Sequence, residues 1–218
     1  MPSRKKTRTT ASDFCPTRST SKFEQVRRMV AAEAARIMAT EAQSNYRIAK
    51  LKAAHRLGAG ADTALPSNLE VEHALRDYQA FYGGTRHLDH LFEMRSAALR
   101  AMRLLEPFHP RLVGPVLDGT ADEYARVTLH VFNDPPDAVS IHLLEKGLHF
   151  SSEQRRIRWH DGGHRLVPLL VVHAPDTDIE LALFACVDLR QAPPSPIDGR
   201  PLKRAPVTEV ECLLAGAC

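Results

Sequence analysis

The sequence changes character at Pro110, and this change constrains the fold more than any other feature. Before Pro110, apolar residues recur three and four positions apart through Ala-rich and Leu-rich stretches, a spacing that is typical of amphipathic helices. After it, short apolar runs alternate with turn residues, a pattern that is typical of strands. This order predicts an α+β fold with N-terminal helices followed by a mixed β-sheet of about five strands with one crossover helix.

Helices are predicted wherever the apolar spacing lies between a start signal and a stop signal. The first begins at Ser21, whose partner Glu24 completes a capping-box spacing, and it ends at Gly58. The predicted N-terminal helices cover residues 21–57, 67–83 and 85–105. The first has a narrow apolar stripe without a sustained heptad, which favours packing on the protein's own sheet over a coiled coil.

Strands are predicted in the second part of the chain. They cover residues 111–117, 125–132, 148–159, 165–173 and 179–187. The last two read as an antiparallel hairpin. Because Pro168 lies inside its run and cannot donate a backbone hydrogen bond, that strand is expected at a sheet edge or with a bulge. Helices over residues 138–147 and 207–215 and an extended Pro-rich crossing over residues 191–206 complete the prediction.

Charge divides the chain unevenly. Residues 1–60 hold 13 Lys/Arg against 4 Asp/Glu, whereas the formal charge of the whole chain is +3. We therefore expect a disordered basic arm (1–20), a helical segment (21–108) and an α+β domain (109–218). The arm could contact nucleic acid through its first four cations, Arg4, Lys5, Lys6 and Arg8, because such residues attract phosphate backbones.

Composition excludes several classes of protein. The hydrophobic share of 44% and the charged share of 25% are ordinary for globular domains. No apolar run reaches the roughly 18 residues that a membrane span needs, so no membrane partner is expected. The N-terminus has no apolar stretch of the kind found in secretory signals, which predicts a cytoplasmic protein. The four cysteines form no CxxC pair, which argues against a zinc ribbon or a disulfide scaffold and predicts reduced thiols.

The most informative spacing joins two predicted strands. Val113-Gly114-Pro115 is followed, after ten intervening residues, by Arg126-Val127-Thr128-Leu129. This spacing resembles the signature of the DNA polymerase β-like nucleotidyltransferases, in which a strand ends in Gly-Ser or Gly-Gly and a later strand carries Asp-x-Asp or Asp-x-Glu. In that family the small pair lets a triphosphate approach the backbone, and two carboxylates on one strand face hold the Mg²⁺ ions.

This sequence departs from that signature at its centre. Pro115 stands in place of the second small residue, and Arg126 and Thr128 stand in place of the two carboxylates. The family's third carboxylate, on a later strand, corresponds to Asp178 or Glu180, which are the candidate catalytic residues. One acid alone cannot hold two Mg²⁺ ions.

A wider resemblance extends over roughly residues 22–215. Residues 50–79, 106–132 and 189–205 resemble a group of small proteobacterial proteins in which a nucleotidyltransferase-like domain follows an N-terminal helical segment. In that group an acidic residue commonly occupies the position of Arg126. Some members are labelled UDP-N-acetylmuramate-alanine ligases, but this sequence contains no GxxxxGK[ST] loop, which ATP-dependent ligation would need.

A nucleotide pocket is the functional interpretation of these positions. Its candidate residues are Gly114, Gly119, Thr120, Arg126, Thr128, Arg200 and Lys203. An arginine at position 126 would supply fixed positive charge where the family binds Mg²⁺. The alternatives also stand: the glycines turn the chain between strands, Arg126 faces solvent, and the turn before Lys203 is a surface turn. The His87/His90 and His160/His164 pairs are expected to be solvated or hydrogen-bonded, and no metal site is expected.

Three functional hypotheses follow. In the first, the chain is a degenerate nucleotidyltransferase-fold protein that binds a nucleotide, RNA or protein partner without a cofactor and without metal-dependent transfer. In the second, it is an active Mg²⁺-dependent enzyme whose rearranged site draws on acids from two regions, Asp118, Asp122, Glu123, Asp178 and Glu180. In the third, the helical segment is an interaction or oligomerisation module that the sheet supports. The sequence does not determine the oligomeric state.

Overall fold

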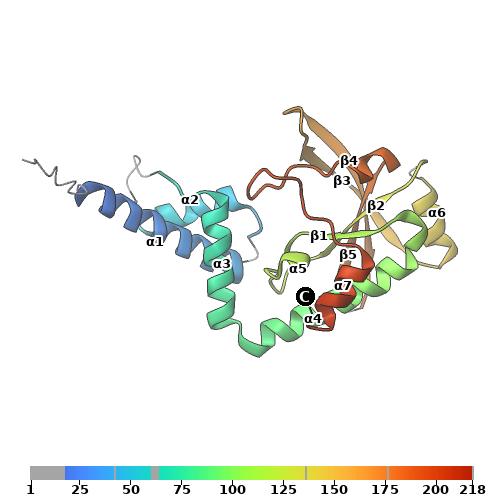
Figure 1. Ribbon diagram of the computed structural model, residues 1–218, viewed down its shortest axis with the longest axis horizontal. Coiled ribbons are helices and arrows are strands. Elements are labelled where there is room, and N and C mark those ends of the chain that lie inside the picture. Colours follow the sequence, from blue (N-terminus) through green and yellow to red (C-terminus); the bar gives the residue numbers. More distant parts are fainter. Residues whose placement is uncertain (1–17, 42, 60–63, 136, 176, 218) are drawn as a thin grey trace, which may run out of the picture.

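The computed structural model describes residues 18–41, 43–59, 64–135, 137–175 and 177–217. They form seven α-helices and a five-stranded mixed sheet, which confirms the expected α+β fold (Figure 1). No helix within these ranges is both long and apolar enough to cross a membrane. The four cations of the expected arm, Arg4, Lys5, Lys6 and Arg8, lie outside the described residues.

Four helices precede the sheet. They are α1 (Arg18–Thr40), α2 (Tyr46–Arg56), α3 (Asn68–Tyr82) and α4 (Gly84–Leu104). The prediction of a single helix over residues 21–57 is wrong, because the helix is interrupted between Thr40, the end of α1, and Tyr46, the start of α2. The cause is Asn45, whose side chain accepts hydrogen bonds from the backbone N–H groups of Arg47 and Ile48 and so starts a new helix.

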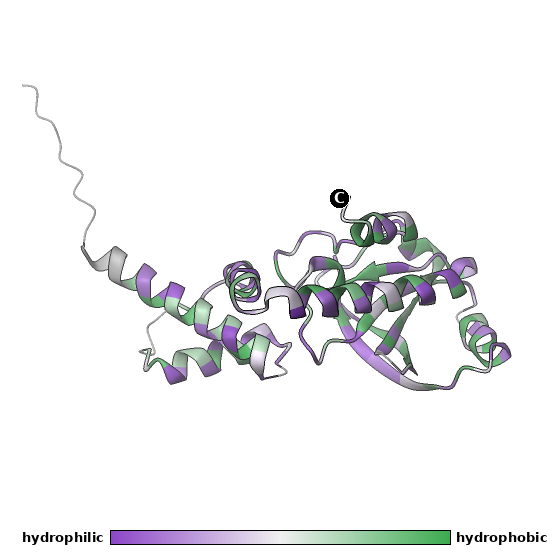
Figure 2. Cartoon of the chain, turned by 90° about the horizontal axis from the view of Figure 1, so that it is seen from below, coloured by the Kyte–Doolittle hydropathy of each residue, from purple (hydrophilic) through white to green (hydrophobic). Residues whose placement is uncertain are grey.

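The first three helices pack on one another. Buried residues from each of them form a separate apolar cluster, which includes Val30, Ile37, Ala53, Val71 and Leu75. The apolar stripe of α1 therefore packs on α2 and α3, and the expectation that it packs on the sheet is wrong. Hydrophilic and hydrophobic stripes run along the helices (Figure 2), so each can bury one side and expose another.

The sheet has the order β1-β2-β5-β4-β3. Its strands are β1 (Arg111–Val113), β2 (Val127–Phe132), β3 (Phe150–Arg158), β4 (His164–His173) and β5 (Asp178–Phe184). β2 and β5 are parallel, whereas the other neighbours are antiparallel, including the expected β4–β5 pair. The crossover helix α6 (Asp137–Glu145) follows β2, and α7 (Val207–Leu214) closes the chain.

Two details of the strands differ from the sequence expectation. The run predicted over residues 111–117 is a strand only to Val113, because Gly114 turns the backbone and the short helix α5 (Pro115–Asp118) begins. β4, which contains Pro168, lies inside the sheet and pairs with β3 without a bulge. Pro168 is tolerated because the pairing of β4 with β5 starts only at Leu169, one residue later.

The sheet has two different faces. One face packs on α4, α6 and α7 and forms the main apolar core, with Leu129, Leu181 and Met102 among its buried residues. The other face carries a smaller apolar cluster around Phe132, Trp159 and Phe184 at one end. Among the described residues, no apolar cluster covers the opposite end of this face, where Thr128 and Glu180 lie, and this end holds the candidate site.

The cysteines differ in their chemical state. Cys186 has a free thiol and is exposed, whereas Cys212, on α7, is disulfide-bonded. The expectation of reduced thiols is therefore wrong for Cys212.

Candidate functional site

The register of the sheet brings two of the predicted positions together. Thr128 on β2 and Glu180 on β5 are Cα partners across the parallel pair, so their side chains leave the same face of the sheet. Glu180 is only 1% exposed. A buried carboxylate needs a charged partner or several hydrogen-bond donors, because burial without either is costly.

Arg155 supplies that partner. Its Nη1 and Nη2 atoms donate to Glu180 Oε1 and Oε2, each at 2.5 Å. Arg155 lies on β3 and reaches across β4, the strand between β3 and β5. Two parallel charge-assisted bonds fix the plane of the guanidinium as well as its position. A protein cation thus pairs with Glu180, one of the two acids that the resemblance offers as the family's third carboxylate.

A second ion-pair network surrounds Arg126, immediately before β2. Its Nε lies 3.6 Å from Asp178 Oδ2, and its Nη1 lies 3.9 Å from Glu153 Oε1. Asp178 also contacts His173, with 2.9 Å between Oδ1 and Nδ1. The two candidate catalytic acids therefore contact different side chains: Asp178 contacts Arg126 and His173, and Glu180 contacts Arg155.

The loop between β1 and β2 contains the predicted glycines. Gly114 has φ +74° and ψ −156°, a conformation open essentially only to glycine. Gly119 has φ +80° and ends α5. Helices α3 and α4 hold this loop through side chains: His87 Nε2 lies 3.1 Å from the Gly119 carbonyl oxygen, and Gln79 Nε2 donates to the Thr120 carbonyl at 3.0 Å. The loop is therefore fixed from outside the sheet.

Helix α4 provides further contacts to this loop. His90 Nε2 lies 3.1 Å from the carbonyl oxygen of Asp122, and Arg95 donates to the carbonyl oxygens of Val116 and Leu117. Burial lowers the pKa of Arg95 and raises that of Asp122. His87 and His90 thus act as hydrogen-bonded anchors of the loop.

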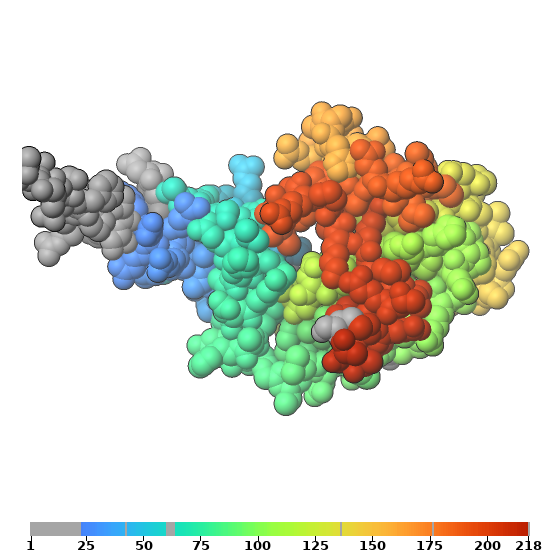
Figure 3. All heavy atoms as spheres, in the orientation of Figure 1, coloured from blue at the N-terminus to red at the C-terminus, as the bar shows by residue number. Residues whose placement is uncertain are grey.

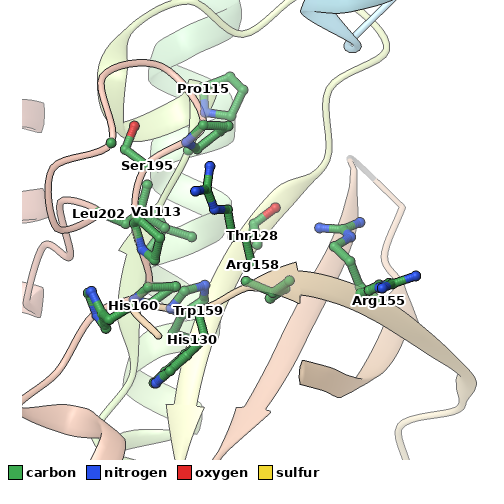
Figure 4. Close-up of a pocket in the computed structure, with 17 residues that line it drawn as sticks. Val113, Pro115, Thr128, His130, Arg155, Arg158, Trp159, His160, Ser195 and Leu202 are labelled. Atoms are coloured by element: carbon green, nitrogen blue, oxygen red, sulfur yellow. The ribbon is translucent and has the colours of Figure 1, made fainter. Parts of the chain in front are cut away.

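Two cavities meet at Thr128, Pro115 and Arg155. The larger has a volume of about 890 Å³ and lies between β1, β2, the end of β3 and residues 193–202 (Figure 4). The smaller, of about 510 Å³, lies between the sheet and the first three helices. Gly114 lines the larger cavity, Thr120, Arg126 and Glu180 line the smaller, and Thr128 lines both. Cavities of these sizes are typical of small-molecule and cofactor sites.

Two further arginines line the larger cavity, and the sequence analysis did not identify them. Arg156 and Arg158 follow Arg155 on β3 and are exposed. Neither has an ion pair or side-chain hydrogen bond within the described part of the chain, in contrast to Arg126, Arg155 and Arg165. The Arg-Arg-Ile-Arg run at residues 155–158 was the available signal.

His130 lies deeper in the larger cavity. Burial and the neighbouring guanidinium of Arg204 lower its pKa to about 3. Arg204 Nε donates to His130 Nδ1 at 3.1 Å, which places the remaining ring proton on Nε2. Arg204 itself packs over the rings of Phe132 and Phe184, and burial lowers its pKa to about 10.

Several predicted residues do not line either cavity. The Arg200 side chain is 86% exposed, with its Nε 3.9 Å from Asp198, and Lys203 Nζ pairs with Glu209 at 2.7 Å. Gly119 and Asp178 also lie outside both linings. The acids of the second hypothesis do not form a ligand set: among the described residues, no group of three or more His, Cys, Asp or Glu side chains could hold a metal ion.

Comparison with known proteins gives limited similarity. No protein-family model and no curated protein matches the sequence. The similar solved structures include Cid1 in complex with the UTP analog UMPNPP, at a TM-score of 0.31 and 16% identity, over 43% of this chain and 30% of Cid1. A second Cid1 structure, described by its RNA terminal uridylyl transferase activity, has a TM-score of 0.27 and 14% identity, over 42% and 30% of the two chains. This chain therefore spans less than a third of the length of Cid1.

Proposed function

We propose that this protein binds a phosphate-bearing ligand, either a nucleotide or an RNA segment, in the joined cavities and does not carry out metal-dependent transfer. The observation that carries the proposal is the bidentate pair between Arg155 and Glu180. The guanidinium of Arg155 binds Glu180, which among the described residues is the only fully buried acid on the open face of the sheet, the face opposite α4, α6 and α7. Because both oxygens of Glu180 accept from Arg155, this acid is already paired without Mg²⁺, and phosphate charge has to be balanced by other cations of the cavity.

Arg156 and Arg158 are the proposed phosphate contacts. Because Arg155 is committed to Glu180, the unpaired charge at the larger cavity comes from these two neighbours. Arginine is suited to phosphate because its planar group donates two parallel hydrogen bonds. Thr128 and Gly114 line the same cavity, and Trp159, though 4% exposed, is also among its lining residues.

The binding test uses a matched pair of double variants. Arg156→Met with Arg158→Met removes two cations from the cavity, whereas Arg28→Met with Arg47→Met removes two exposed arginines of α1 and α2 that line neither cavity. Fluorescence anisotropy with labelled nucleoside triphosphates and a single-stranded RNA should show a loss of at least about tenfold in affinity for the first pair only, since each charged hydrogen bond contributes about 1.5–3 kcal/mol. Equal losses of affinity in the two double variants would show that only the net charge of the protein matters, and would contradict the proposed site.

The transfer test addresses catalysis separately. Each of the four labelled nucleoside triphosphates is incubated with Mg²⁺, protein and an RNA acceptor. We expect no incorporation of label. Incorporation that Glu180→Gln abolishes would establish the active enzyme of the second hypothesis and refute the proposal.

A further inference from the structure

The described residues form three separate apolar clusters. One lies within residues 18–82, here called the helical unit, and draws on α1, α2 and α3. The others lie within residues 84–217, here called the sheet unit, and draw on α4 and everything after it. None of these clusters contains residues of both units. Units that bury their apolar surface separately move relative to each other unless a large apolar interface joins them.

The two units meet at Gly83-Gly84. α3 ends at Tyr82 and α4 begins at Gly84, so the chain bends sharply between them (Figure 1). Gly84 has φ +50°, and a Cβ on Gly83 would lie 2.5 Å from the Gln79 carbonyl oxygen and 2.7 Å from His87 Cβ. Both positions thus favour glycine, the residue whose backbone changes conformation most freely. Hinges consist of a few such positions at the ends of rigid elements.

Few polar contacts connect the two units across the cleft, which is the space between them that contains the smaller cavity. Within the described residues, two side-chain hydrogen bonds cross it: Asn68 Nδ2 donates to the Pro196 carbonyl at 2.6 Å, and Gln79 Nε2 donates to that of Thr120 at 3.0 Å. Figure 3 shows the segment around Pro196 extending from the sheet unit to the helical unit. Gln79 is 7% exposed, and its buried Oε1 has no hydrogen-bond partner. An unpartnered buried acceptor disfavours the arrangement that buries it.

The smaller cavity lies between the two units. The helical unit contributes Met38, Tyr46 and Leu75 to its lining, and the sheet unit contributes Thr128, Arg155 and Glu180. We propose that the helical unit rotates about Gly83-Gly84 as a rigid body, between this closed arrangement and an open one that exposes the cavity. The Asn68–Pro196 and Gln79–Thr120 hydrogen bonds hold the closed arrangement. The inference rests on the proposed function for what the cavity takes up, but the rotation itself does not depend on a ligand.

Single-molecule energy transfer in the full chain tests the rotation. Two dyes are attached through azidophenylalanine at Leu51 on α2 and Leu144 on α6, both of which are exposed and outside the cavities. Asn68→Asp removes the donor to Pro196 but keeps an oxygen for Lys50, which donates to Asn68 Oδ1 at 2.7 Å. Losing one hydrogen bond should raise the ratio of open to closed molecules about fivefold.

Matched variants make the test decisive. Asn45→Asp introduces the same charge in the helical unit, and aspartate caps α2 as well as asparagine does, so the ratio should equal that of the wild type. Adding Gln79→Glu to Asn68→Asp removes both crossing donors and should raise the ratio about twenty-fivefold if the two bonds act independently. Distance distributions that are identical in all four proteins would overturn the rotation.

Adding inorganic pyrophosphate separates this inference from the proposed function. A shift of the wild type towards the closed arrangement supports both. Sensitivity to Asn68→Asp without any effect of pyrophosphate supports the rotation and counts against phosphate binding in the cleft. The two proposals can therefore fail independently.

Discussion

Removing Arg155 should destabilise the protein more than neutralising its partner does. Arg155→Met leaves the carboxylate of Glu180 as an unpaired charge in a site that is 1% exposed. Breaking a buried pair in this way costs about 3–5 kcal/mol. Because the Arg155 side chain is 49% exposed, solvent screens part of the interaction, and we reduce the expected loss to about 2–3 kcal/mol.

Glu180→Gln leaves a different situation. The guanidinium that loses its partner is half exposed and can turn towards water, so the expected loss is only about 1 kcal/mol. The double variant Arg155→Met/Glu180→Gln removes both charges and should cost less than the sum of the two single losses. The coupling energy of the cycle should be about 1 kcal/mol or more.

Urea denaturation followed by fluorescence measures these losses. Trp159 is the single tryptophan of the chain, and it is buried beside Phe184 on the open face of the sheet. Its emission therefore reports the unfolding of the sheet unit. An unchanged dependence on urea concentration shows that a shift of the midpoint is a change in stability. Equal losses for the two single variants, or strict additivity, would refute the ion-pair reasoning.

Three further predictions concern other parts of the chain. The pKa of His130 in the folded protein, about 3, lies below its ordinary value of 6.5. Between pH 7 and pH 5 the unfolded chain therefore binds a proton at His130 that the folded chain does not, and the free energy of unfolding should fall by about 2 kcal/mol. Urea midpoints measured at both pH values should show a much smaller loss for His130→Asn than for the wild type. Gly114→Ala should cost about 1–3 kcal/mol, measured by calorimetry, through backbone strain alone, since its Cβ would meet no atom within 4 Å; a neutral outcome would contradict the assigned conformation. Deleting residues 1–17, which carry Arg4, Lys5, Lys6 and Arg8, should reduce the slope of log RNA affinity against log salt concentration by about 3, and the melting temperature should stay unchanged. An identical slope would show that these residues do not contact RNA.

The sequence predicted the type and order of nearly all elements, because periodicity and turn residues are local signals. The predicted boundaries of helices and strands were wrong where a single side chain or a single backbone conformation determines them. Asn45 divides the first helix by capping the second, and Gly114 ends β1 after Val113. The edge strand or bulge predicted from Pro168 was wrong, because a proline is tolerated in an inner strand where the neighbouring strand does not pair. Whether β5 pairs at Pro168 is a property of the assembled sheet.

The candidate site was only partly predictable. The motif spacing identified Thr128, and the resemblance gave Asp178 or Glu180 as the third carboxylate. The parallel register brings Thr128 and Glu180 together. It could not identify Arg155, because the hydrogen bonds to Glu180 span an intervening strand and join residues 25 positions apart. Arg200 and Lys203 were chosen because a tight turn followed by positive charge could cover the pocket, but their side chains contact Asp198 and Glu209 and do not line the cavities. Charge in a sequence shows that cations are present, but only packing decides where they point.

The affinity for a nucleoside triphosphate in the presence and absence of Mg²⁺ tests the central claim most directly. If Arg155 takes the place of the metal at Glu180, the dissociation constants measured by calorimetry with EDTA and with Mg²⁺ should agree within about threefold, a difference of less than about 0.7 kcal/mol. Binding that appears only with Mg²⁺, or that tightens by tenfold or more when it is added, would contradict the claim that a protein cation has replaced the metal.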